Sequence, residues 1–291
     1  MLARHAEIAG KYVYVDVEGT EYRVYYEESG QGIPLVCQHT AGTDGRQWRH
    51  LLEDPEVTAN YRVIAHDLPF HGKSLPPTTF EWWKEEYSLT QDFFMKFLVA
   101  FSRALELDDP VYIGSSMGGH MAGDLALHHP DEFRAVIGCE ASLESHGAET
   151  LLPYYNHPQV SNEFKGSVMY GLCAPMSPEQ ARRETIWVYS QDAPLTFRGD
   201  LNYYVSDHDL SATAKDIDTN LIDVYLLSGE YDWSATPEDS KALADAIVGS
   251  EFVFMEGLGH FPMCENYEKF TTYLYPVLDS IRAKSELSVS A

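Results

Sequence analysis

Positive charge is scarce in this chain, and long apolar runs are absent. Its 291 residues include 45 acidic side chains but only 20 lysines and arginines, which gives a formal net charge of −25. Such a field repels phosphate backbones and anionic lipid surfaces, so we expect neither nucleic acid nor a membrane as a partner. No stretch of about 18 apolar residues occurs, which predicts that no helix spans a membrane.

Cysteine is also rare, with only four residues: Cys37, Cys139, Cys173 and Cys264. None has C-x-x-C spacing, which argues against a disulfide framework or a zinc site and indicates reduced core cysteines. Residues 1–13 lack a continuous apolar core, so they do not predict a secretory signal. We therefore expect a cytoplasmic protein, and the sequence leaves a monomer or a homodimer open.

Short apolar runs alternate with helical segments along most of the chain. Two alternating runs, at residues 12–17 and 22–26, predict an opening β-hairpin. Six further runs read as buried, mostly parallel strands, at residues 34–38, 61–65, 111–114, 135–139, 224–227 and 252–254. This alternation predicts an α/β fold with a mostly parallel eight-stranded sheet flanked by helices.

One serine stands in a pattern that is typical of a nucleophile. Residues 114–118 read Gly-Ser-Ser-Met-Gly, a G-x-S-x-G motif between an apolar run and a helix start rich in small residues. A sharp strand-to-helix turn needs small neighbours two residues before and after the serine, because the backbone passes close to itself there. The turn exposes the hydroxyl and points helix N–H groups at whatever it attacks. Ser116 is therefore the candidate nucleophile.

A serine hydroxyl needs a base, and the base needs a third group that orients it. His260 lies in the glycine-containing loop 257–262, between the last predicted strand and the last helix, and is the candidate base. Asp232 follows the preceding strand, so its loop should lie beside the loop of His260. Glu140 ends the strand that follows the Ser116 helix, at the same edge of the sheet, and is the alternative acid.

The alternation is interrupted in one long segment, residues 142–218, which lacks a clear buried strand. A capping-box pattern at residues 177–180 predicts a helix that runs through Trp187. We expect a helical lid at 142–218, inserted into a core domain of residues 1–141 and 219–291. Most aromatic side chains of the lid should pack it onto the core, and the others, with Trp187 as a candidate for substrate binding, should line an apolar cavity above the serine.

Along the chain, the order serine, acid, histidine is that of the α/β-hydrolases. From residue 22 to 281 the sequence resembles a lid-bearing member of this superfamily, of the serine esterase or lactonase type. The Ser116 segment is similar to the nucleophile elbow, and residues 65–74 are similar to the D-x-x-G-H-G-x-S loop. The loops of Asp232 and His260 resemble the family's acid and histidine loops. The resemblance implies an α/β-hydrolase fold, a Ser-His-Asp triad, and neither a metal nor an organic cofactor.

The oxyanion hole is where this chain departs from the family. The family commonly has His-Gly after the third core strand, whereas residues 39–42 here read His-Thr-Ala-Gly. By that alignment the backbone N–H groups of Ala41 and Met117 are the two donors. Nearby, Arg46 could bind a substrate carboxylate through its forked guanidinium, or pair with an acidic side chain at the surface.

These residues predict a serine hydrolase that cleaves a carboxylic ester or lactone of a small, fairly hydrophobic substrate through an acyl-enzyme. A serine at the elbow argues against the dehalogenases and epoxide hydrolases of this fold, which use aspartate there. Some lactonases of the fold, such as zearalenone lactonases, place an acid where Glu140 lies, which favours a lactone. The alternative is a carbon–carbon bond hydrolase of the meta-cleavage type, which Arg46 as a clamp would support. A second alternative is a small-molecule receptor on a hydrolase scaffold.

Overall fold

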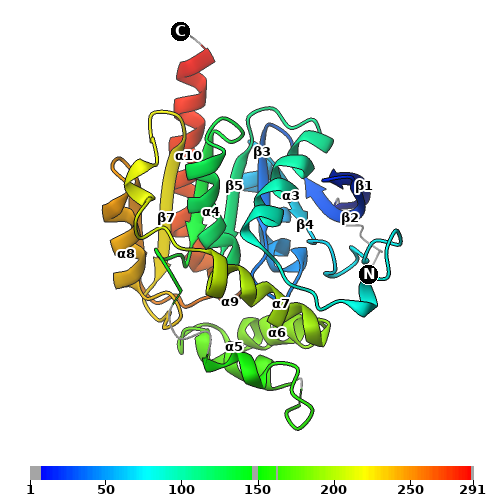
Figure 1. The fold of residues 1–291 in the computed structure, drawn as a ribbon. Helices are drawn as coiled ribbons and strands as arrows, with labels where there is room; N and C mark the ends of the chain where they lie inside the picture. Colours follow the sequence, from blue (N-terminus) through cyan, green and yellow to red (C-terminus); the bar gives the residue numbers. More distant parts are fainter. Residues whose placement is uncertain (1–7, 146–149, 162, 290–291) are drawn as a thin grey trace, which may run out of the picture.

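A single sheet of eight strands forms the centre of the molecule (Figure 1). The computed structural model describes residues 8–145, 150–161 and 163–289. The spatial strand order is β1-β2-β4-β3-β5-β6-β7-β8, with antiparallel pairing of β1 with β2 and of β2 with β4, and parallel pairing elsewhere. The strands are β1 (Ala9–Val17), β2 (Thr20–Ser29), β3 (Ile33–Gln38), β4 (Tyr61–His66), β5 (Val111–Ser115), β6 (Ala135–Cys139), β7 (Asp223–Gly229) and β8 (Glu251–Met255). All the predicted strands and the opening hairpin are confirmed.

Helices cover both faces of the sheet, with α3 and α4 on one face and α10 on the other (Figure 1). The longer helices are α3 (Gln91–Ala104), α4 (Met117–His128), α5 (Glu163–Leu172), α6 (Glu179–Tyr189), α7 (Pro194–Asn202), α8 (Pro237–Ala246) and α10 (Tyr267–Val289). Short helical turns are η1 (Gly45–Trp48), α1 (Arg49–Leu52), α2 (Pro55–Thr58), η2 (Trp82–Lys84), η4 (Leu152–Tyr154), η5 (Tyr203–Asp207), η6 (Ala214–Asp216) and α9 (Pro262–Glu265). Among the described residues, no helix is both long and apolar enough to cross a bilayer.

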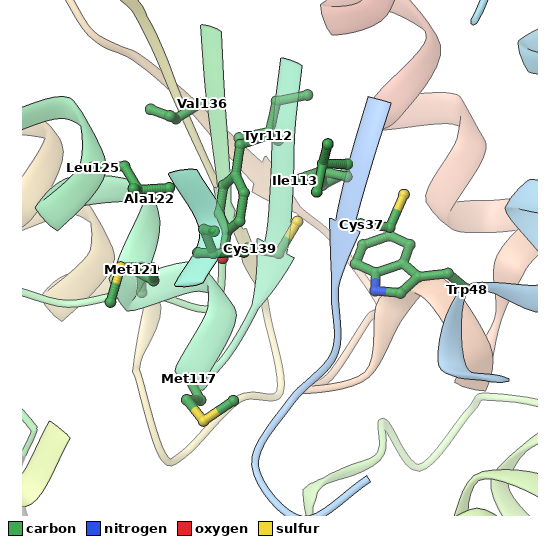
Figure 2. Close-up of a cluster of buried hydrophobic side chains, with 14 of the residues drawn as sticks. Cys37, Trp48, Tyr112, Ile113, Met117, Met121, Ala122, Leu125, Val136 and Cys139 are labelled. Atoms are coloured by element: carbon green, nitrogen blue, oxygen red, sulfur yellow. The ribbon is translucent and has the colours of Figure 1, made fainter. Parts of the chain in front are cut away.

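Helix α4 packs tightly on the middle of the sheet. Figure 2 shows Met121, Ala122 and Leu125 of α4 facing Tyr112 of β5 and Val136 of β6. Burying side chains of this size contributes about 1.5–3 kcal/mol each relative to leaving them exposed. This packing fixes the position of the first turn of α4, which begins directly after the candidate nucleophile.

The start of α4 comes so close to β6 that a side chain would not fit between them. A Cβ atom on Gly119 would collide with the carbonyl oxygen of Cys139. Figure 2 also shows Trp48 beside Cys37 on the side of the sheet away from α4. All four cysteines are buried and free, which confirms the expectation of reduced core residues.

Between β6 and β7 the chain forms α5, α6 and α7, which lie across the carboxyl end of the parallel strands (Figure 1). An isolated bridge pairs Glu144 with Asp209 near the two ends of this insertion. The exact lid boundaries, 142–218, stay a prediction. The insertion nevertheless covers the edge of the sheet at which β5, β6, β7 and β8 end.

The predicted helix that contains Trp187 is α6, but its start differs from the expectation. It begins at Glu179, and the structure shows no side-chain cap. Instead of capping the helix, the hydroxyl of Ser177 donates a hydrogen bond to Glu265 Oε1, at 3.1 Å. The capping-box prediction was wrong because Pro178, and not Ser177, occupies the N-cap position of α6, and proline has no side-chain acceptor.

Candidate active site

The candidate nucleophile occupies a strained turn between β5 and α4. Ser116 has φ 55° and ψ −117°, in a region that residues other than glycine rarely adopt. Its N–H donates to the carbonyl of Cys139 at 2.9 Å, which anchors the turn to β6. A Cβ at Gly114 would collide with the carbonyl oxygen of Gly118, which explains the small residues on either side of the serine. The structure therefore has the sharp strand-to-helix turn that the motif predicts.

The candidate base and acid are hydrogen-bonded to each other. His260 Nδ1 donates to Asp232 Oδ2 at 2.7 Å, and both side chains are buried. The other oxygen of Asp232 accepts from the N–H of Ser234 at 2.7 Å. Because a carboxylate only accepts hydrogen bonds, His260 holds its proton on Nδ1 and keeps Nε2 free to accept another. The hydroxyl of Ser115 donates to the carbonyl of His260 at 3.4 Å, so the histidine loop lies against the residue next to the candidate nucleophile.

Glu140, the alternative acid, lies behind this pair and not on the histidine. Both of its carboxyl oxygens accept from the N–H of Gly229, at 3.1 and 3.0 Å, where the Asp232 loop begins. Burial and the neighbouring charge of Asp232 raise the pKa of Glu140 well above its ordinary range. A raised pKa favours the protonated form of Glu140, and within the described residues Glu140 makes no hydrogen bond to His260.

Another buried carboxylate holds the histidine loop against the lid. Glu265 accepts from the N–H of Gly259 at 2.6 Å, from the N–H of Ala174 at 3.2 Å and from Ser177. Gly259 directly precedes His260, while Ala174 lies in the turn between α5 and α6. One carboxylate thus joins the candidate base to the lid.

The two predicted oxyanion donors are backbone N–H groups of buried residues. Among the described residues, no hydrogen bond engages the N–H of Ala41 or of Met117. The loop that carries Ala41 is held by other contacts: His39 Nδ1 donates to the carbonyl of Thr40 at 2.8 Å, and His39 Nε2 accepts from Leu68 N–H at 3.2 Å. Unpaired buried N–H groups are rare in folded proteins, so two of them at one edge of the sheet suit a transient anionic ligand.

Asp200 of α7 also supports the loop that carries Ala41, and the sequence did not predict this role. Its Oδ2 accepts from the N–H of Gly42 at 2.7 Å and from His71 Nε2 at 2.8 Å, and its Oδ1 accepts from the hydroxyl of Tyr87 at 2.9 Å. Burial would lower the pKa of His71, but the charge of Asp200 and its hydrogen bond raise it to about 9. Helix α7 is therefore joined to the loop of residues 39–42, here called the oxyanion loop, by the hydrogen bond from Gly42, and to His71 by a buried ion pair. No motif in the sequence of the insertion signals either contact.

Because His71 is charged in the fold, stability should decline at alkaline pH. The pKa of His71 is about 9, above its ordinary value of about 6.5, so the pair contributes fully below about pH 6.5 and its contribution is lost as the pH rises through 9. The gap between the two pKa values corresponds to about 3 kcal/mol of unfolding free energy. Urea unfolding at several pH values should show a shallower decline for His71→Gln than for the wild type. Equal declines would mean that His71 is neutral in the fold.

His120 contacts the turn at Ser116, and the sequence did not predict this contact. Its position four residues after Ser116, one helical turn along α4, could have indicated it. Its Nδ1 donates to the carbonyl of Ser116 at 2.8 Å. Burial, together with the nearby His208, lowers the pKa of His120 to about 3, so its ring stays neutral. A neutral ring braces the strained turn and adds no charge beside the candidate nucleophile.

A cavity of about 1000 Å³ lies beside this site, between residues 191–196 of the lid and the segment 70–88. The described residues that line it include Arg46 but none of the candidate triad. Two bonds from the guanidinium of Arg46 reach Asp44, at 2.8 and 2.6 Å, and a third reaches Gln191. Arg46 thus forms the pair with an acid that the sequence left open as an alternative to a substrate clamp.

Trp187, the candidate substrate-binding residue of the lid, is not brought to the site. Its side chain is 67% exposed on α6, and it is absent from the described lining of that cavity. Two other aromatic rings of the insertion contact the loop of residues 39–42. Tyr189, two residues after Trp187 on α6, is hydrogen-bonded to Thr40, and Phe197 of α7 packs against Gly42. Within the described residues, no group of three or more histidine, cysteine or acidic side chains is arranged to hold a metal ion.

Comparisons with known proteins support an α/β-hydrolase fold. The family model described as "alpha/beta hydrolase fold" matches residues 33–168. The 2-hydroxy-6-oxononadienedioate/2-hydroxy-6-oxononatrienedioate hydrolase of Burkholderia vietnamiensis is 34% identical over 140 residues, which are 46% of this chain and 45% of that protein. Such matches to curated relatives span less than half of the relatives' length.

Solved structures match over nearly the whole chain, at low sequence identity. A thermophilic esterase from Thermogutta terrifontis is 20% identical, with a TM-score of 0.78 over 94% of this chain and 99% of that chain. The enol-lactonase from Burkholderia xenovorans is 21% identical, with a TM-score of 0.76 over 91% of this chain and 98% of that chain. At this level of identity the likeness establishes the shared fold.

Proposed function

Because this chain is an α/β-hydrolase-fold protein, we propose that it is a serine hydrolase which cleaves a carboxylic ester or lactone of a small, mostly apolar substrate. The observation that carries this proposal is the buried hydrogen bond from His260 to Asp232, together with the strained turn at Ser116 and two backbone N–H groups that have no partner among the described residues. A strained residue that the surrounding structure holds in place is typical of catalytic sites.

In the proposed mechanism, Ser116 Oγ attacks the substrate carbonyl while His260 Nε2 takes its proton. Asp232 keeps the imidazole in the required tautomer and stabilises the imidazolium that forms. The N–H groups of Ala41 and Met117 hold the oxyanion, and one such donor contributes about 10²–10³-fold in kcat. His260 then protonates the leaving alkoxide, and an acyl-enzyme remains on Ser116. Water, activated by the same histidine, hydrolyses the acyl-enzyme and releases the acid.

The surroundings of the oxyanion loop favour an uncharged substrate. Rings of Tyr189, Phe197, Tyr155 and Phe261 form one cluster, with centroid distances of 4.6 Å for Tyr155–Phe197 and 5.4 Å for Tyr189–Phe261. Tyr189 is hydrogen-bonded to Thr40 of the loop. Such apolar walls exclude water and strengthen the hydrogen bonds to a developing oxyanion.

A second candidate function is hydrolysis of a carbon–carbon bond in a ring-fission diketone. It is favoured by the similarity to the Burkholderia vietnamiensis hydrolase, whose name describes such a substrate. Such a substrate carries carboxylates, which a free guanidinium could bind through its forked N–H groups. Because Arg46 is already bound to Asp44 and Gln191, the ester or lactone proposal stays first.

Intact-mass labelling with an organophosphonate tests the nucleophile. The wild type should gain one phosphonyl group, and Ser116→Ala should gain none, because only an activated serine reacts at this rate. Ser115→Ala is the matched control: its hydroxyl makes only a long bond to the His260 carbonyl, so this variant should still be labelled. An unlabelled wild type, or a labelled Ser116→Ala, would contradict the proposal.

A substrate panel separates the two reactions. We expect turnover of aryl esters or lactones with kcat/KM at least about tenfold above that for ring-fission diketones, which is a difference of about 1.4 kcal/mol in transition-state binding. The reverse order would favour the carbon–carbon hydrolase and would leave the role of Ser116 intact.

A further inference from the structure

We infer that the cavity beside the active site binds a small organic cation, such as a quaternary ammonium compound. The site is distinct from the candidate triad, because none of Ser116, His260 and Asp232 belongs to its described lining. It therefore goes beyond the proposed hydrolysis and does not depend on it. At about 1000 Å³, the cavity is large enough for a drug-sized ligand.

Aromatic rings form much of the cavity wall. Phe70 is part of this wall, with its ring centroid 4.8 Å from that of Tyr87 and 6.4 Å from that of Trp82. The ring of Trp83 lies 5.8 Å from that of Trp82, edge to face. The electron-rich faces of such rings attract cations, and tryptophan does so most strongly.

The backbone of Phe70, within this wall, is conformationally strained. Its φ is +72°, a value that a bulky residue rarely adopts. The other non-glycine residues with positive φ among those described are Ser116 and Glu140 in the candidate active site, and Glu18, Glu106, Asp109 and Asn156 in turns or bends elsewhere. The positive φ of Phe70 therefore marks local strain in this wall.

The charges of the lining suit a cation and disfavour an anion. Acidic side chains outnumber basic ones, since the lining includes Glu27, Asp44, Asp67, Glu85, Glu86 and Asp192 but only Arg46 and Lys73. Both cations are engaged: Arg46 binds Asp44, and Lys73 donates to the hydroxyl of Tyr25 and pairs with Glu27. No free basic group of the described lining remains for an anionic ligand.

The carboxylate of Glu85 is available to pair with a cationic ligand. Glu85, beside Trp82 and Trp83 in the chain, has no ion-pair or side-chain hydrogen-bond partner among the described residues. The lining also contains an internal example of the proposed recognition, since the ammonium of Lys73 lies 4.1 Å from the centroid of the Tyr25 ring. A ligand ammonium against Trp82 and near Glu85 would repeat this contact.

Two isosteric probes isolate the effect of the charge. Choline and 3,3-dimethyl-1-butanol differ only by a nitrogen cation in place of a carbon, and calorimetric titration of the wild type can compare them. Choline should bind about 10–30-fold more tightly, as expected for a cation on aromatic faces. Equal affinities, or tighter binding of the alcohol, would overturn the inference.

Variants locate the binding in this cavity. Glu85→Gln should weaken choline binding by about two- to fivefold and leave the alcohol unaffected, because it removes only a partly exposed charge. Trp82→Ala should weaken choline binding by about tenfold. The matched controls are Glu81→Gln, in the same segment, and Trp187→Ala, since both residues lie outside the described lining.

Neither control variant should change the affinity, and Ser116→Ala should bind choline like the wild type. Full choline affinity in both Glu85→Gln and Trp82→Ala would overturn the inference. If instead Ser116 is never labelled by the phosphonate while choline binding follows this pattern, only the proposed hydrolysis fails. The two proposals are therefore tested separately.

Discussion

An Asp232→Asn variant is expected to lose about 10⁴-fold in kcat with a small change in KM. The amide nitrogen of asparagine cannot accept the Nδ1–H of His260, so the imidazole would hold its proton on the nitrogen that must serve as the base. The carboxylate and His260 are 2.7 Å apart and buried, so water cannot substitute for the lost acceptor. Steady-state kinetics with an aryl ester or lactone found in the panel measures the effect.

Glu140→Gln is the matched control for that variant. Burial and the nearby Asp232 favour the protonated form of Glu140, and glutamine is a neutral side chain of similar size that can still accept from the N–H of Gly229. We expect kcat within about tenfold of the wild type, since no transition-state contact is lost. A mild Asp232→Asn together with a severe Glu140→Gln would exchange the roles of the two acids.

Asp200→Ala is expected to lower the free energy of unfolding by about 3–5 kcal/mol. The change leaves the charged His71 buried without its partner, which is the costly way to break a buried pair. It also leaves the N–H of Gly42 and the hydroxyl of Tyr87 without an acceptor. Urea unfolding near pH 7 measures the loss, and a loss under about 1 kcal/mol would contradict the charge assigned to His71.

A second buried pair separates general instability from an effect on the oxyanion loop. Asp124 accepts from His208 at 3.0 Å, and both side chains are fully buried, but this pair does not touch Gly42. Asp124→Asn and Asp200→Asn should be destabilised to similar degrees. Under conditions in which both are folded, Asp200→Asn should lose about 10²-fold in kcat, because the N–H of Ala41 is no longer held in place. The loss should exceed that of Asp124→Asn, whose partner His208 reaches the Ser116 turn only through the ring of His120.

The strands and the turn at Ser116 were predicted correctly because a short local sequence pattern specifies each of them. The strands are short apolar runs, and the G-x-S-x-G turn requires its own small neighbours, so Ser116 and the sheet were predictable from a few residues each. The contact between Asp232 and His260 was predictable from the rule that parallel strands bring their following loops to one edge. Each of these inferences needs only the order of elements along the chain.

Contacts between the lid and the core were not predictable in this way. Asp200 meets His71 across 129 positions of sequence, and neither residue stands in a motif that specifies a partner. The exposed position of Trp187 and the buried position of Tyr189 depend on how α6 is rotated against the core. A rotation of this kind depends on the packing of the whole lid, and a prediction from composition alone does not contain it.

The bond between α7 and the oxyanion loop limits how this protein could be redesigned. A chimaera that received the lid of another hydrolase would lose the acceptor for Gly42 and the counter-charge of His71, even if the new lid had a suitable shape. Grafted lids should therefore retain an aspartate at position 200, or be combined with a neutral residue in place of His71. Under the proposed function, substrate range and turnover would change together, because α7 carries both Phe197 beside Gly42 and Asp200, which holds the N–H of Gly42.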